Sequence, residues 1–167
     1  MLKAILVSLC LLLSVEGAST PRALADVTVP MPDGKKVRLT QYRGKVMVVA
    51  LVSTTCDHCI NSLQMLSKLQ QEYGPKGFQA LGIAANDGAQ ESLPGFIRLQ
   101  IGLPVGYLDQ TTTMQVFDFK RDDSPFVPMY MFVDKKGTVR FQYAGKDDFF
   151  KNEEKNTRLL IEALLKQ

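Results

Sequence analysis

The sequence contains no tryptophan, a single histidine (His58) and three cysteines among its 167 residues. One histidine excludes a metal site built from several histidines. Three cysteines are too few for a small fold held together by disulfides, and a formal net charge of +3 is too small to indicate a nucleic-acid-binding surface. A hydrophobic fraction of 46% and a charged fraction of 22% are typical of a folded globular chain, which excludes disorder as its main state.

The apolar run at the start of the chain is also short. It covers residues 4–15, whereas a membrane-spanning helix needs about 20 apolar residues. Lys3 precedes the run, and Ala23-Leu24-Ala25 has the small-x-small pattern of a signal-peptidase site. We therefore predict a secretory signal peptide over residues 1–25 and one domain over residues 26–167, exported to the periplasm or another part of the bacterial cell envelope. The alternatives are an uncleaved anchor and a buried N-terminal helix.

Along the predicted domain, apolar runs typical of strands alternate with amphipathic stretches typical of helices. Residues 46–53 and 78–85 are largely apolar, which indicates central strands buried on both faces. Residues 57–73 carry apolar side chains three and four positions apart, which predicts a helix. The order of elements predicts an α/β fold, with a mixed central sheet, helices on both faces and an N-terminal β-hairpin. Further strands are expected at 27–32, 35–39, 105–108, 129–133 and 138–143, and further helices at 93–100, 111–117 and 153–167.

Cys56 and Cys59 form a Cys-x-x-Cys motif just after the strand predicted over residues 46–53. At the start of a helix, free backbone N–H groups and the helix dipole stabilise an anion, which favours a Cys56 thiolate. Cys59 lies on the same face of the first turn and can close a disulfide, as two-electron thiol exchange requires. Cys10 leaves with the predicted signal peptide, so a zinc site has too few ligands. A structural disulfide closing so small a loop would stabilise the fold little.

The two residues between the cysteines have opposing electrostatic effects. His58, protonated or donating from its ring, would stabilise the Cys56 thiolate and make the disulfide more oxidising. A carboxylate at Asp57 opposes thiolate formation unless it faces solvent or caps the helix. The alternative for His58 is an exposed side chain without a redox role. We take Cys56, Cys59 and His58 as the candidate catalytic residues and predict no metal ligand.

These motifs together resemble the thioredoxin superfamily, and within it the exported TlpA/ResA-like thiol-disulfide oxidoreductases of the AhpC/TSA and Redoxin group. The resemblance rests on Asp33-Gly34, residues 39–45 (LTQYRGK), the CDHC sequence, and Val127-Pro128 before MYMFVDKKGTV. It implies a thioredoxin-like fold and a cis-proline at Pro128 that faces the cysteines. It also implies that Val127 and Pro128, with Thr55, hold the backbone of a substrate. A trans proline that merely begins a strand is the alternative.

Three features depart from the family pattern. Thr55 replaces the usual tryptophan before the first cysteine, and Ala50 replaces the buried acid of thioredoxins. Ser62 and Gln64 replace the glutamate and the proline that TlpA/ResA-like proteins often carry. Both usual proton-relay acids are therefore missing, which leaves open how Cys59 loses its proton. The candidate acceptors are water, Asp57 and Asp122.

The resemblance implies a thiol-disulfide oxidoreductase that needs no cofactor and acts on cysteine-containing proteins, with a redox partner protein. Neither nucleic acid nor a membrane span after signal removal is expected, and the oligomeric state and the direction of exchange stay open. One alternative is a peroxiredoxin-like peroxidase. Ser53 matches the Thr or Ser that peroxiredoxins carry three residues before the reactive cysteine, but Val49 stands where they have proline. A further alternative is a copper-binding module, in which Cys56, Cys59 and His58 offer soft ligands.

Overall fold

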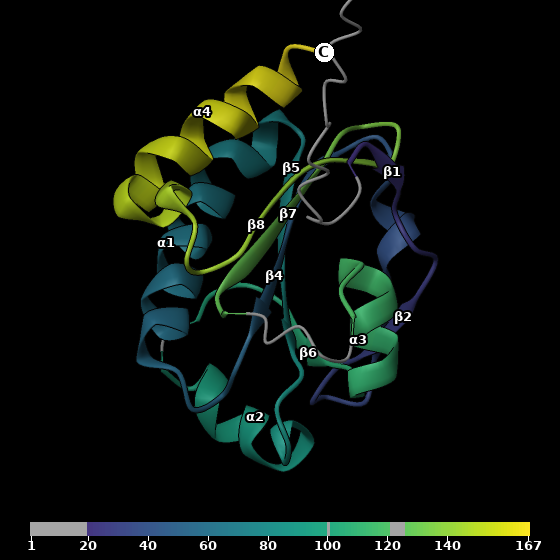
Figure 1. Cartoon of the computed structure of the whole chain (residues 1–167), viewed down its shortest axis with the longest axis vertical. Coiled ribbons are helices and arrows are strands. Elements are labelled where there is room, and N and C mark those ends of the chain that lie inside the picture. The colour runs from purple at the N-terminus through teal and green to yellow at the C-terminus, as the bar shows by residue number, and fades with distance from the viewer. Residues whose placement is uncertain (1–19, 100, 121–125) are drawn as a thin grey trace, which may run out of the picture.

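A six-stranded mixed sheet runs through the centre of the molecule (Figure 1). The computed structural model describes residues 20–99, 101–120 and 126–167. The strand order is β1-β8-β7-β4-β5-β6, in which β4, β5 and β6 are parallel and β7, β8 and β1 pair antiparallel. A separate hairpin joins two further strands. The strands are β1 (Arg22–Ala23), β2 (Thr28–Pro30), β3 (Lys36–Arg38), β4 (Val46–Val52), β5 (Phe78–Ala84), β6 (Val105–Tyr107), β7 (Met129–Val133) and β8 (Thr138–Tyr143).

The central strand β4 is buried at every residue, which explains its unbroken apolar sequence. Side chains of a strand alternate between the two faces of a sheet. Val46, Val48 and Ala50 therefore enter one apolar core, while Met47 and Val49 enter the other. Because β4 has no face toward water, both sides of the sheet must be covered by other elements.

Helices α1 (Asp57–Tyr73) and α4 (Glu153–Leu165) cover one face of the sheet (Figure 1). Leu63, Leu66 and Leu69 of α1 are fully buried at the helical spacing that the sequence predicted. Helix α2 (Ala89–Ile97) contributes to the same core. The other face is covered by α3 (Gln110–Phe117), the β2–β3 hairpin and the short 3-10 helix η1 (Leu39–Tyr42). Two further 3-10 turns are η2 (Gly74–Lys76) and η3 (Asp148–Asn152).

The predicted α/β, thioredoxin-like architecture is confirmed, although several element bounds differ. Helix α2 begins at Ala89, four residues before the predicted start, because Ala89 packs into the core one turn ahead of Leu93. Helix α3 begins at Gln110, and its cap is Asp109, whose carboxylate accepts a hydrogen bond from the Thr112 backbone at 2.9 Å. Both differences lie at helix ends, where local cap geometry decides the boundary.

The last residues of the predicted signal peptide lie in the sheet. Strand β1 pairs with β8, the Arg22 guanidinium donates to the Gln142 side chain at 2.6 Å, and Leu24 is only 6% exposed. Residues 1–19, including Cys10, are outside the described part of the chain. Among the residues that are described, no helix is long and apolar enough to cross a membrane.

We expect a chain that begins at Asp26 to be less stable than one that begins at Thr20. The shorter chain lacks the burial of Leu24 and the hydrogen bonds of Arg22. We expect the loss of these interactions to lower its free energy of unfolding by about 2–4 kcal/mol. Urea unfolding of both chains measures the difference. In the longer chain, Leu24→Ala should reproduce a large part of the loss. Equal stabilities of the two chains would show that β1 contributes nothing.

Candidate active site

Cys56 is the N-cap of α1, at the point where the chain leaves β4 and turns into the helix. Its backbone is extended (φ −114°, ψ 110°), and its sulfur accepts a hydrogen bond from the Cys59 backbone N–H at 3.2 Å. The N–H groups of a first helical turn have no partner within the helix and carry the positive end of its dipole. The same sulfur, once reduced, is therefore in a position that favours the thiolate.

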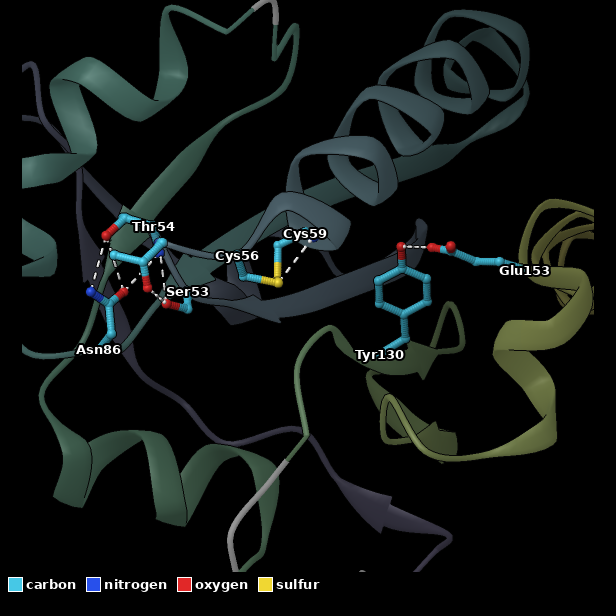
Figure 2. The surroundings of a disulfide bond; sticks show 8 residues. Ser53, Thr54, Cys56, Cys59, Asn86, Tyr130 and Glu153 are labelled. Carbon is cyan, nitrogen blue, oxygen red and sulfur yellow. Dashed lines mark hydrogen bonds between the residues drawn. A yellow bond between two sulfur atoms is a disulfide. The ribbon is translucent and has the colours of Figure 1, made fainter.

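Cys56 and Cys59 are joined by a disulfide, with their Cα atoms 5.3 Å apart (Figure 2). The two cysteines differ in exposure, because Cys56 is partly exposed and Cys59 is fully buried. A disulfide in which solvent reaches one sulfur suits exchange, since an incoming thiolate attacks the accessible sulfur. The geometry therefore gives the two cysteines unequal access from outside the protein.

The segment before Cys56 is held by the end of the neighbouring strand. The Asn86 side chain, just after β5, accepts a hydrogen bond from the Thr54 backbone at 2.8 Å and donates to the Thr54 hydroxyl at 3.0 Å (Figure 2). The Ser53 and Thr55 hydroxyls hydrogen bond to each other at 2.9 Å, and the Cys56 backbone donates to the Ser53 carbonyl. Thr55 is exposed beside this network. Asn86 was not among the predicted site residues, although parallel strands end at the same edge of a sheet and Asn86 lies two residues beyond the end of β5.

Val127 and Pro128 approach the same edge from the antiparallel strand β7. The peptide bond between them is cis, Pro128 is buried, and Met129 pairs with Leu51 of β4. Val127 packs against the same core cluster as Cys56. It also lines a cavity of about 230 Å³ whose walls include Ser53, Asn86, Gln110 and Phe119. Among the residues that the structure describes, none of the side chains that line this cavity is charged.

His58 and Asp57 occupy the exposed first turn of α1. Within the described part of the chain, His58 makes no hydrogen bond or ion pair, so its effect on Cys56 must act through space or through solvent. Asp57 is an acidic residue in a first helical turn, where its carboxylate interacts favourably with the helix dipole. Among the described residues, no group of three or more His, Cys, Asp or Glu side chains is arranged to hold a metal ion.

A buried polar pair lies on the α1 side of the sheet and was not identified from the sequence. Tyr130 of β7 is fully buried, and its hydroxyl donates to the carboxylate of Glu153, the first residue of α4 (Figure 2). Burial and, next, the charge of Glu153 raise the pKa of Tyr130 well above its ordinary value. The nearby Ser62 side chain of α1 acts in the opposite direction and lowers the pKa of Tyr130. The sequence feature that could have pointed to this pair is the single hydroxyl, that of Tyr130, in the otherwise apolar strand MYMFV.

Tyr130 stands directly opposite Ala50 in the β4–β7 register. Ala50 is the position at which thioredoxins carry a buried acid. The titratable hydroxyl of Tyr130 therefore lies on the strand next to that position. Of the other acceptors considered for the Cys59 proton, Asp57 is exposed, and Asp122 lies outside the described residues.

Comparisons with known proteins support the same fold, but the similar proteins carry the names of two different kinds of enzyme. Residues 21–147 match the sequence profile of the AhpC/TSA family. A putative thiol:disulfide interchange protein DsbE from Chlorobium tepidum is similar in structure, with a TM-score of 0.75 and 19% identity over 89% of this chain and 99% of that one. A putative thioredoxin from Neisseria meningitidis has a TM-score of 0.62 and 23% identity, covering 85% and 92% of the two chains.

The curated relatives in sequence are peroxidases. A chloroplastic phospholipid hydroperoxide glutathione peroxidase 1 from Arabidopsis thaliana is 35% identical over 75 residues, which are 44% of this chain and 32% of the relative. Glutathione peroxidase 1 from Helianthus annuus is 34% identical over 74 residues, or 44% of each chain. The chain thus spans less than half the length of these two relatives.

Proposed function

Because the chain belongs to the AhpC/TSA family and carries a disulfide at the start of α1, we propose that it is a thiol-disulfide oxidoreductase acting on cysteine-containing proteins. The observation that carries the proposal is the unequal exposure of the two cysteines, with Cys56 partly exposed and Cys59 fully buried. A structural disulfide needs no accessible sulfur, whereas exchange with a second molecule does.

In the reducing direction, the Cys56 thiolate attacks one sulfur of a substrate disulfide. A bond forms between Cys56 and that sulfur, and the other substrate sulfur leaves as a thiolate that takes up a proton. Cys59 then loses its proton and attacks the Cys56 sulfur, which releases the second substrate thiolate and closes the Cys56–Cys59 disulfide. The oxidising direction is the reverse sequence, and a redox partner protein restores the starting state.

The substrate backbone would lie along Val127 and Pro128, with Thr55 at the other side of the exposed sulfur. Support comes from the position of Val127, which lines the same cavity as Ser53 and Asn86. We also propose that the protein works in the cell envelope after export by the N-terminal signal. Its support is the apolar run over residues 4–15 with the preceding Lys3. The names of the solved relatives, a thiol:disulfide interchange protein and a thioredoxin, are consistent with protein substrates.

Substitution of the two cysteines should have different effects. Cys56→Ser removes the attacking sulfur, so disulfide reduction in insulin should fall to the uncatalysed rate. Cys59→Ser leaves the attack intact but prevents resolution, so a mixed disulfide with the substrate should accumulate and appear by mass spectrometry. Turnover that persists in Cys56→Ser would refute the proposed exchange, and Ser67→Ala, a second buried α1 position, serves as the control.

The reduction potential should lie above about −270 mV, the value of thioredoxin, if His58 stabilises the thiolate. His58→Ala should then lower the potential by roughly 30 mV, which corresponds to about one unit in a thiol pKa. Equilibration with a glutathione redox buffer measures both proteins. Asn61→Ala, at another exposed position of α1, is the matched control. An unchanged potential in His58→Ala would leave His58 without a redox role.

A thiol peroxidase is the second candidate, because the curated relatives are glutathione peroxidases. The Cys56 thiolate would attack a hydroperoxide oxygen, giving a sulfenic acid on Cys56 and an alcohol once the leaving alkoxide is protonated. Cys59 would condense with the sulfenic acid, forming the disulfide and water. The Val49 position, where peroxiredoxins carry proline, weighs against this candidate.

Stopped-flow mixing of the reduced protein with a lipid hydroperoxide separates the two activities. For an oxidoreductase, we expect Cys56 to be oxidised about as slowly as a free thiol, because Val49 stands where peroxiredoxins carry proline. Oxidation orders of magnitude faster than that of a free thiol at the same pH would instead establish the peroxidase.

A further inference from the structure

Tyr130 places a hydroxyl inside an apolar core that shows no packing need for one. It lies in the same buried cluster as Cys59 and Ala50, and aromatic rings, including Phe132 and Phe149, pack against it. A buried hydroxyl is costly unless it is hydrogen bonded, and phenylalanine would fill the same volume without that cost. Packing alone therefore does not account for the Tyr130 hydroxyl or its hydrogen bond to Glu153, which suggests a role for the pair in the reaction.

Polar side chains follow one another from Cys59 towards the start of α4. Ser62 is 2% exposed and follows Cys59 by three residues, so both side chains lie on the buried face of α1 in adjacent turns. The Ser62 side chain is close enough to Tyr130 to lower the pKa of its hydroxyl, and that hydroxyl donates to Glu153. Glu153 is partly exposed at the beginning of α4.

We propose that Ser62, Tyr130 and Glu153 form the path by which the buried Cys59 thiol loses and regains its proton. The inference rests on the proposed exchange reaction. Cys59 is fully buried, so its proton needs a route to water each time the disulfide closes. The three residues act through Cys59 and position its proton; they do not contact the substrate.

During resolution, Cys59 attacks the Cys56 sulfur, and the bond between Cys56 and the substrate sulfur breaks. The Cys59 proton passes to the Ser62 oxygen as the Ser62 proton moves to Tyr130. The Tyr130 proton moves to the Glu153 carboxylate, which then releases a proton to water. The substrate leaves as a thiolate and is protonated by solvent, so atoms and charges balance.

The properties of the groups assign Glu153 as the acceptor and Tyr130 as the relay. Because the pKa of Tyr130 is raised, its hydroxyl stays protonated and can only pass a proton on as it receives another. Several other titratable groups on the same elements are exposed or have partners of their own. Asp57 and His58 are exposed on α1, Lys151 of η3 pairs with Asp148 at 2.7 Å, and Glu154 pairs with Arg158 on the outer side of α4. Tyr143 of β8 packs on Phe149, and burial raises its pKa.

The test is single-turnover reaction of the full, reduced protein with a chromogenic aromatic disulfide. The first thiolate released reports attack by Cys56, and the second reports resolution by Cys59. In Tyr130→Phe, we expect an unchanged first phase and a second phase about 10²-fold slower near neutral pH, the low end of what a positioned acid or base contributes. The rate of the second phase should recover at higher pH, with its profile shifted by about one unit or more.

Glu153→Gln keeps a hydrogen-bond acceptor for Tyr130 and removes the charge, so it should slow the second phase as well. If Tyr130→Phe fails to fold, Glu153→Gln alone tests the proton path. The matched controls are Glu154→Gln, in the same turn of α4, and Tyr143→Phe, in the same aromatic cluster; both should retain the normal pH profile.

The outcomes separate the two proposals. If the wild-type protein shows no first phase, the exchange reaction itself is wrong. If the first phase is normal and Glu153→Gln resolves at the wild-type rate across the pH range, the exchange reaction stands and the proton path is refuted. Equal slowing of both phases in Tyr130→Phe and Glu153→Gln, with no shift in the pH profile, would assign these residues a purely structural role.

Discussion

The burial of β4 on both faces is the constraint on which the rest of the structure depends. A strand with no exposed face fixes its neighbours on either side, β5 in parallel and β7 antiparallel, and requires cover above and below the sheet. The carboxyl end of β4 thereby becomes a fixed point at one edge. Cys56 follows it after a short turn, held by Asn86 from the end of β5. The Cys56–Cys59 disulfide thus lies just beyond the end of the fully buried central strand.

The sequence predicted this arrangement well where a pattern was local. The apolar runs of β4 and β5 and the periodicity of α1 each reflect burial of one continuous segment, so the central elements and the place of Cys56 could be anticipated. The pair of Tyr130 and Glu153 could not, because it depends on the β4–β7 register and on where α4 docks. Strand β1 was missed for another reason, since its residues fitted a cleavage signal better than they fitted a strand.

The comparisons show how little of the chemistry is determined by the scaffold. Interchange proteins share the fold at low identity, while the curated sequence relatives are peroxidases that match over less than half of this chain. Both candidate reactions of this chain begin with attack by the Cys56 thiolate. What differs is the second reactant, which is either a sulfur or a peroxide oxygen, and the groups that surround that atom decide between them.

The short strand β1 has a further consequence for how the molecule behaves in a crowded solution. It pairs with Thr138 and Val139 at the outer side of β8, which is the margin of the sheet. An open sheet margin can recruit a strand from another molecule, and proteins avoid this by covering it or placing charges there. Beyond Val139, β8 continues with the charged Arg140 and with Phe141, which is 37% exposed. In a chain that keeps Arg22 and Ala23, these two residues therefore cover part of a margin at which self-association could otherwise begin.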